Sequence, residues 1–176
     1  MYQVAVVGHS LVPESVEGPG LDFHVFRKPG GKWEDFWGPR FSVFRRGGFD
    51  LVILVFGGND LAGTRPVNNI IEEAKSVIRC AKGCARNVRV CLAETRKYNE
   101  RNRFNVVNEE YKKRRNKYNR TMRRLLNREH VRHIDLGKPW YANERTSDGV
   151  HFNAEAVESF KREIVRVSLG VKASVV

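Results

Sequence analysis

Leu51-Val-Ile-Leu-Val-Phe56, followed directly by Gly57-Gly58-Asn59-Asp60, is the stretch that decides the fold of this 176-residue chain. Six consecutive apolar residues that end in turn-forming residues are typical of a strand covered on both faces. Val4 to Val7 and Val88 to Ala93 are two further runs of this kind. Two weaker strand candidates are Leu21–Phe26, whose alternation places it near a sheet edge, and the short run Val131–Ile134.

Helical periodicity lies between these strands. Apolar residues recur at helical spacing from Ile70 to Ala81, where Gly83 is a plausible stop, and again from Phe104 to Leu125. Asn153 is suited to cap a last helix, with an inner face made of Val157, Phe160, Ile164 and Val167. Alternating strands and helices favour right-handed βαβ units. We therefore predict one α/β domain over residues 1–176, a three-layer α/β/α sandwich with a five-stranded, mostly parallel sheet.

Polar residues of chemical interest follow the predicted strands. Gly8-His9-Ser10 comes after the first strand, Gly57 to Asp60 after the central one, and Asp148-Gly-Val-His151 just before the last helix. Open α/β sheets bind ligands beyond the carboxyl ends of their strands. The three segments are therefore expected to meet at one end of the sheet.

These segments resemble the conserved blocks of the SGNH (GDSL-like) hydrolase family, which has a flavodoxin-like α/β fold. Gly8-His9-Ser10-Leu11 corresponds to the first block, Gly57-Gly58-Asn59-Asp60 to the third, and Asp148-Gly-Val-His151 to the fifth. The second block requires a glycine after the second strand. We favour Gly30, because Gly30 to Asp35 looks like the family's Gly-x-x-x-x-Asp run, with Gly31 as the alternative. Each block is weak alone, but their order and their placement together are specific.

The resemblance implies a serine esterase that cleaves carboxylic esters of acyl or acetyl groups. Ser10 would be the nucleophile, His151 its general base, and Asp148 the carboxylate that orients the imidazole. The Ser10 and Gly30 backbone N–H groups and the Asn59 side-chain amide would form the oxyanion hole. His9 departs from the family, which has Asp there. A neutral His9 could support the nucleophile turn as that Asp does, or it could line the site.

Each assignment has a structural alternative. Ser10 could cap a helix after the first strand, Asn59 and Asp60 could form a turn and a helix cap, and His151 could pair with Asp148 at the surface. Residues 94–103 follow a strand end, so we expect them to overhang the site and to shape the substrate. Their charge argues weakly for an anionic substrate.

The net charge of +12 is concentrated in one segment. Arg96 to Arg132 contains fourteen Lys or Arg against four Glu, and the rest of the chain is nearly neutral. Such a segment can attract nucleic acid or an anionic membrane surface, although a solvated helix face is the usual fate of such charges. Its aromatic residues share the apolar stripe and are expected in the core. The candidate anion-binding residues are Arg114, Arg115, Arg123 and Arg124.

A second hypothesis follows from this segment: an SGNH-like RNA-binding module with weak or no catalysis. The arrangement is similar to the esterase-type domains in first-reading-frame proteins of some non-LTR retrotransposons. An active hydrolase that is attracted to RNA or to anionic lipid would combine both signals. Because the chain keeps Ser10, Asn59, Asp148 and His151, it does not match the family branch that has lost its catalytic residues.

The remaining features limit which cofactors, cross-links and cellular locations are expected. No motif suggests a metal, a nucleotide or a flavin, so we expect no cofactor. Cys80, Cys84 and Cys91 lack the number for a disulfide framework and the spacing for zinc, and are expected to be reduced thiols. No apolar run is long enough to cross a bilayer, and the N-terminus lacks the features of a signal peptide. We therefore expect an intracellular, cytoplasmic protein or a domain of a longer chain.

Overall fold

The computed structural model describes residues 1–96, 108–136 and 150–174. The five strands are β1 (Tyr2–Gly8), β2 (Leu21–Arg27), β3 (Phe49–Val55), β4 (Ala85–Cys91) and β5 (Arg132–Ile134). The α-helices are α1 (Ser42–Arg45), α2 (Gly58–Leu61), α3 (Val67–Cys84), α4 (Asn108–Arg128) and α5 (Ala154–Ala173). Two short 3₁₀ helices, η1 (Trp33–Trp37) and η2 (Pro39–Phe41), lie between β2 and α1.

The strands form one sheet in the order β2-β1-β3-β4-β5, and all four pairings are parallel. This order is that of flavodoxin-like folds. The prediction of a five-stranded, mostly parallel sheet is confirmed, and the central run at residues 51–56 falls on β3. The alternating strand β2 lies at an edge, as its pattern indicated.

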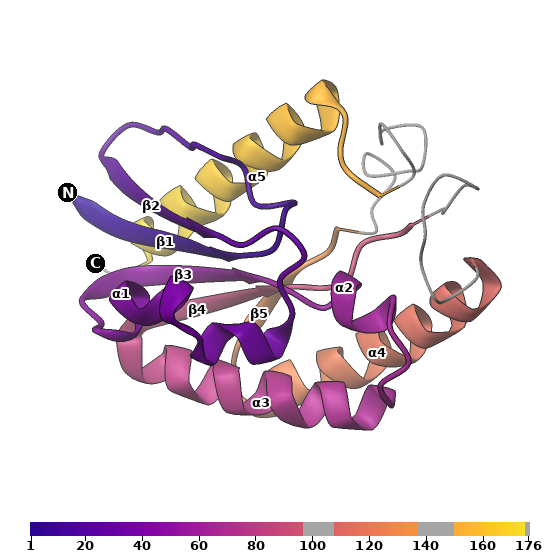
Figure 1. Ribbon diagram of the computed structural model, residues 1–176. Coiled ribbons are helices and arrows are strands. Elements are labelled where there is room, and N and C mark those ends of the chain that lie inside the picture. The colour runs from indigo at the N-terminus through magenta and orange to yellow at the C-terminus, as the bar shows by residue number, and fades with distance from the viewer. Residues whose placement is uncertain (97–107, 137–149, 175–176) are drawn as a thin grey trace.

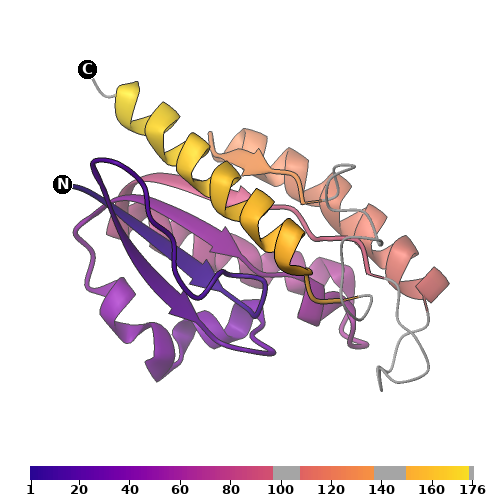
Figure 2. The same cartoon turned by 90° about the horizontal axis from the view of Figure 1, so that it is seen from above.

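Helices cover both faces of the sheet. In Figure 1, α5 lies on one side of the strands and α3 and α4 lie on the other, and Figure 2 shows α5 running across its face of the sheet. Strand residues alternate between the two layers because successive side chains point to opposite faces. Leu51 and Ile53 belong to the cluster beneath α5, and Val52 and Leu54 belong to the cluster beneath α3 and α4.

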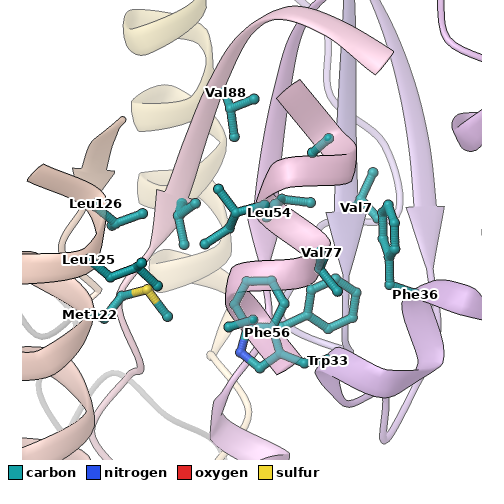
Figure 3. Packing of buried hydrophobic residues seen from close by; sticks show 14 of the residues in the cluster. Val7, Trp33, Phe36, Leu54, Phe56, Val77, Val88, Met122, Leu125 and Leu126 are labelled. Carbon is teal, nitrogen blue, oxygen red and sulfur yellow. The ribbon is translucent and has the colours of Figure 1, made fainter. Parts of the chain in front are cut away.

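The larger core fills the layer beneath α3 and α4. Figure 3 shows Met122, Leu125 and Leu126 of α4 facing the strand residue Leu54, with the rings of Trp33 and Phe56 further along the same layer. Those two rings lie 5.0 Å apart between centroids. Tyr111 and Tyr118, also on α4, are fully buried, as expected for residues of the apolar stripe.

The helix ends differ partly from the prediction. Asn153 caps α5, its Oδ1 accepting from the Ala156 N–H at 3.0 Å, which confirms that prediction. Gly83 does not stop α3, because the helix runs to Cys84 and β4 begins at the next residue. On α5, Phe160 and Ile164 are buried as expected, whereas Val157 and Val167 are only partly buried at the margins of that face.

Phe104, at the start of the predicted apolar stripe, lies outside the described residues. Cys80, Cys84 and Cys91 are free thiols. Among the helices of the described segments, none combines the length and the apolar character needed to cross a membrane.

Candidate active site

The loop after β1 carries Ser10 on a tight turn. The His9 N–H donates to the Val55 carbonyl at 3.0 Å, and the Val12 N–H donates to the His9 carbonyl at 3.1 Å. Ser10 is half-buried, and its carbonyl accepts from Arg27 Nη2 at 3.2 Å. The next element along the chain is β2, so no helix begins here. The alternative role of Ser10 as a helix cap is therefore wrong.

His9 supports this turn from beneath. Its Nδ1 accepts from the Leu11 N–H at 3.2 Å, and its side chain is fully buried. Burial lowers the pKa of His9 to about 4, against the opposing charge of Glu94, so the imidazole is neutral at neutral pH. A neutral ring leaves Nδ1 free to accept a hydrogen bond. A neutral His9 thus supports the nucleophile turn by accepting a hydrogen bond, which is one of the two roles that the sequence left open for it.

A second turn, after β2, presents Gly30. The Gly31 N–H donates to the Lys28 carbonyl at 2.9 Å, with Pro29 and Gly30 at the centre of the turn. Gly30 has φ +71, a conformation that glycine adopts readily. Because the Gly31 N–H is engaged, the backbone N–H of Gly30 remains the candidate donor.

The two turns lie side by side. The Lys28 N–H donates to the Gly8 carbonyl at 2.9 Å, and a Cβ on Gly31 would lie 3.7 Å from His9 Cα. Asp35 braces the second turn, since it accepts from Lys28 Nζ and from the Lys32 N–H, both at 2.8 Å.

Asn59 joins the site from the end of β3. Its Nδ2 donates to the Gly31 carbonyl at 3.0 Å, and its Oδ1 accepts from Arg96 Nη1 and Nη2 at 3.2 Å each. Asn59 is therefore more than a turn residue, because both ends of its amide are held.

Asp60, the next residue, is buried. Its Oδ2 accepts from the Trp33 N–H at 3.3 Å, and α2 has no side-chain cap. The helix-cap alternative is therefore wrong for Asp60. Burial raises its pKa to about 7, partly offset by the Trp33 hydrogen bond.

Glu94 and Arg96 form a buried ion pair after β4. Arg96 Nη2 lies 2.6 Å from Glu94 Oε1, and both side chains are 1% exposed. The expectation that residues 94–103 overhang the site is wrong for this part, and residues 97–103 lie outside the described residues. The pair was missed because both residues were counted with the surface charges. The signal was a pair of opposite charges directly after an apolar strand.

His151 reaches the same end of the sheet from the start of α5. It is exposed, and the following residue, Phe152, packs in the same apolar cluster as Leu11 and Val12 beside Ser10. The charge of His151 also adds to the effect of burial in lowering the pKa of His9, which places the two imidazoles within electrostatic reach. Asp148 lies outside the described residues.

The candidate anion-binding residues of α4 fall into two groups. Arg114 donates to the carbonyls of Leu61 and Arg65, and Arg115 donates to the carbonyl of Ala93, so both help to dock the helix. Arg123 and Arg124 are exposed, and Arg123 Nη2 lies 3.4 Å from Asp135 Oδ2.

Comparison with known proteins places this geometry in a family. A model of the GDSL-like lipase/acylhydrolase family matches residues 19–158, which include Asn59 and His151 and exclude Ser10. Comparison with curated protein sequences gave no match.

Solved structures share the fold at low sequence identity. A lipase/acylhydrolase from Enterococcus faecalis has a TM-score of 0.74 and 18% identity, over 97% of this chain and 96% of the other. A member of the lipolytic G-D-S-L family from Veillonella parvula has a TM-score of 0.73 and 13% identity, over 93% and 97%. The acetylxylan esterase Axe2 from Geobacillus stearothermophilus has a TM-score of 0.73 and 12% identity, over 95% and 94%.

Proposed function

This chain belongs to the GDSL-like lipase/acylhydrolase family, whose members hydrolyse carboxylic esters. We propose that this chain hydrolyses carboxylic esters through a catalytic triad of Ser10, His151 and Asp148. One observation carries the proposal: the Ser10 turn, the Gly30 turn and the Asn59 amide are joined by hydrogen bonds and close contact at the carboxyl end of the sheet. His151 precedes α5 along the chain, and its neighbour Phe152 packs with Leu11 and Val12 beside Ser10.

In the acylation step, Ser10 Oγ attacks the ester carbonyl carbon while His151 takes the hydroxyl proton. Asp148 stabilises the imidazolium that forms. The carbonyl π electrons move to oxygen, and the tetrahedral intermediate collapses by expelling the alcohol, which leaves with the proton from His151. The acyl group is then bonded to Ser10 Oγ.

The oxyanion of that intermediate is stabilised by the Ser10 N–H, the Gly30 N–H and Asn59 Nδ2. Asn59 is suited to this role because its amide is already held at both ends, so little reorganisation accompanies the reaction. In the second step His151 deprotonates a water molecule, which attacks the acyl carbon. The carboxylic acid is released, and the Ser10 hydroxyl is restored.

Short acyl esters are the first substrates to test. Among proteins of this fold, Axe2 is an acetylxylan esterase. We propose that this chain removes acyl or acetyl groups from a small-molecule or lipid ester, and p-nitrophenyl acetate and butyrate are suitable probes.

The central prediction concerns Ser10. The native protein should hydrolyse p-nitrophenyl acetate and be labelled covalently by a fluorophosphonate, because both reactions need an activated serine hydroxyl. Ser10→Ala should abolish both. Labelling is read by mass spectrometry and turnover by absorbance.

Ser15→Ala is the matched control, because Ser15 is an exposed serine of the same loop and should leave both signals unchanged. Equal labelling of the native protein and the Ser10 variant would refute the assignment of Ser10 as nucleophile.

A second candidate function is RNA binding through α4. The supporting observation is the row of exposed cationic side chains on this helix, which outnumber the two acidic residues of its first turn. The exposed cations are Lys112, Lys113, Lys117, Arg120, Arg123, Arg124 and Arg128. Cationic side chains on one helix face can neutralise successive phosphates. This function is compatible with catalysis at the other site, and an anionic membrane surface is the competing partner.

A further inference from the structure

The buried ion pair of Glu94 and Arg96 carries a large desolvation cost at this end of the sheet. Arg96 Nε and Nη2 lie 2.8 and 2.6 Å from Glu94 Oε1. Removing two charges from water costs more than their attraction commonly returns, so a buried ion pair is weak evidence of a stabilising role. Its position beside Asn59 points to a different role.

Arg96 acts together with the Gly31 carbonyl to fix which way the Asn59 amide faces. A guanidinium group has donors and no acceptor, so only the amide oxygen can face it. Arg96 Nη1 and Nη2 both donate to Asn59 Oδ1, which directs Nδ2 to the opposite side. Nδ2 carries two hydrogens. One is donated to the Gly31 carbonyl, and the second remains for a substrate oxygen.

The reversed amide would be harmful to catalysis. An amide turned by 180° would present Oδ1 where the oxyanion forms, and two electronegative oxygens would then repel each other. We propose that Arg96, held in place by Glu94, is a positioning residue that keeps the Asn59 N–H directed at the oxyanion. This inference rests on the proposed hydrolase function and deepens it.

The backbone at Gly58 is shaped around this pair. A Cβ on Gly58 would collide with Glu94 Oε1 and Arg96 Nη2. Glycine at this position therefore lets the ion pair reach the side chain of the next residue, Asn59. Gly58, which lies between Gly57 and Asn59 in the third block, thus makes room for the positioning contact.

Two other neighbours hold the pair in one geometry. His9 Nε2 lies 3.8 Å from Glu94 Oε1, and its neutral ring adds no competing charge. Tyr111 Oη donates to the Glu94 carbonyl at 2.8 Å, and its ring lies 5.8 Å from the Arg96 guanidinium carbon. Although burial raises the pKa of Glu94, the charge of Arg96 holds it below its usual value, so the carboxylate stays ionised.

The first experiment compares Arg96→Gln and Arg96→Lys in p-nitrophenyl acetate hydrolysis by the full chain. Arg96→Gln should lower kcat by about 100- to 1000-fold, the usual effect of losing one oxyanion donor, with KM nearly unchanged. Arg96→Lys should retain more of kcat, because an ammonium group also offers only donors. Arg45→Gln is the matched control. Arg45 is a half-buried arginine that holds the carbonyls of Phe36 and Gly38 outside the site, and its loss should leave kcat unchanged.

The second experiment separates positioning from structural support. In an Asn59→Ala background, Arg96→Gln should lower kcat no further, because the residue acts through Asn59. An equal loss of kcat in both backgrounds, or native kcat in Arg96→Gln, would overturn the inference.

A third measurement reads the amide itself and does not depend on turnover. The Asn59 side-chain NH₂ signals in a ¹⁵N spectrum, assigned by their absence in Asn59→Ala, should show contacts to Gly31 that are lost in Arg96→Gln. Unchanged signals would overturn the inference. If the native protein has no esterase activity but these signals respond to Arg96, the hydrolase proposal fails while the orienting contact between Arg96 and Asn59 stands.

Discussion

His9 stands in the turn after β1 where the family has an aspartate, and the structure explains why a histidine is accepted there. A short carboxylate and the Nδ1 of a neutral imidazole can both accept a hydrogen bond from the second N–H along the chain. Burial keeps the pKa of His9 far enough below neutrality for the ring to act as an acceptor. The nearest carboxylate oxygen is Glu94 Oε1, which follows β4 along the chain and lies 3.8 Å from His9 Nε2.

Asp60 leads to a prediction for stability against pH. Burial raises its folded-state pKa to about 7, whereas the unfolded value is near 3.8. Between these values the folded state keeps a proton that the unfolded state has released, so Asp60 lowers the free energy of unfolding as pH rises through this window. Asp60→Asn should remove that slope. The free energy of unfolding of the variant minus that of the native protein should therefore increase from about pH 4 to about pH 7.

Urea unfolding at half-unit steps of pH measures this difference. Glu17→Gln is the control, because Glu17 is exposed and its replacement should give a curve parallel to that of the native protein. A parallel curve for Asp60→Asn as well would contradict the prediction.

At the scale of the element, α4 combines two surfaces. Its buried face packs Tyr111, Tyr118 and Met122 against the sheet, and its exposed face carries seven Lys or Arg and two Glu. Between them, Arg114 and Arg115 are half-buried and donate to backbone carbonyls. A helix this basic can therefore pack against the rest of the domain, because some of its arginines donate hydrogen bonds to backbone carbonyls of neighbouring segments.

Arg114→Ala should reduce stability. The substitution removes hydrogen bonds to the carbonyls of Leu61 at 3.1 Å and Arg65 at 2.6 Å, which corresponds to about 1 to 3 kcal/mol in the free energy of unfolding. Lys113→Ala, at the exposed neighbouring position, should change it by less than about 0.5 kcal/mol. Equal effects in urea unfolding would show that the Arg114 contacts do not contribute to docking.

At the scale of the whole molecule, the charge distribution separates the two candidate surfaces. The candidate active site is built around a neutral histidine and a paired Glu94 and Arg96, whereas α4 carries nine Lys or Arg against two Glu. A polyanion and an ester substrate would therefore meet different parts of the protein.

Salt dependence tests the RNA candidate. Affinity for single-stranded RNA should fall steeply between about 50 and 200 mM salt and should survive Ser10→Ala. Replacing exposed Arg123 and Arg124 with Gln should weaken binding, and Arg114→Gln should be judged only after its effect on stability is known. Binding that is absent at low salt would exclude this function, and binding to anionic vesicles alone would favour a membrane surface.

Much of this architecture could be read along the chain. The continuous apolar runs at residues 4–7 and 51–56, and the run at residues 88–93 that only Arg89 interrupts, are local signals, so they predicted three strands of a parallel sheet. The blocks at Ser10 and Asn59 could be placed because they directly follow those strands. Helix ends were less accurate, as at Gly83, where α3 runs one residue further to Cys84.

Sequence alone determined the α/β fold class and, through the family resemblance, the candidate nucleophile and oxyanion donors, because these depend on local patterns and on blocks of a few residues. Tertiary structure alone decided that Glu94 and Arg96 are buried, that Arg96 orients Asn59, and that Arg114 docks a helix. A charged residue has the same local pattern whether it lies in solvent or in a core. Its role depends on partners that lie far away in the chain.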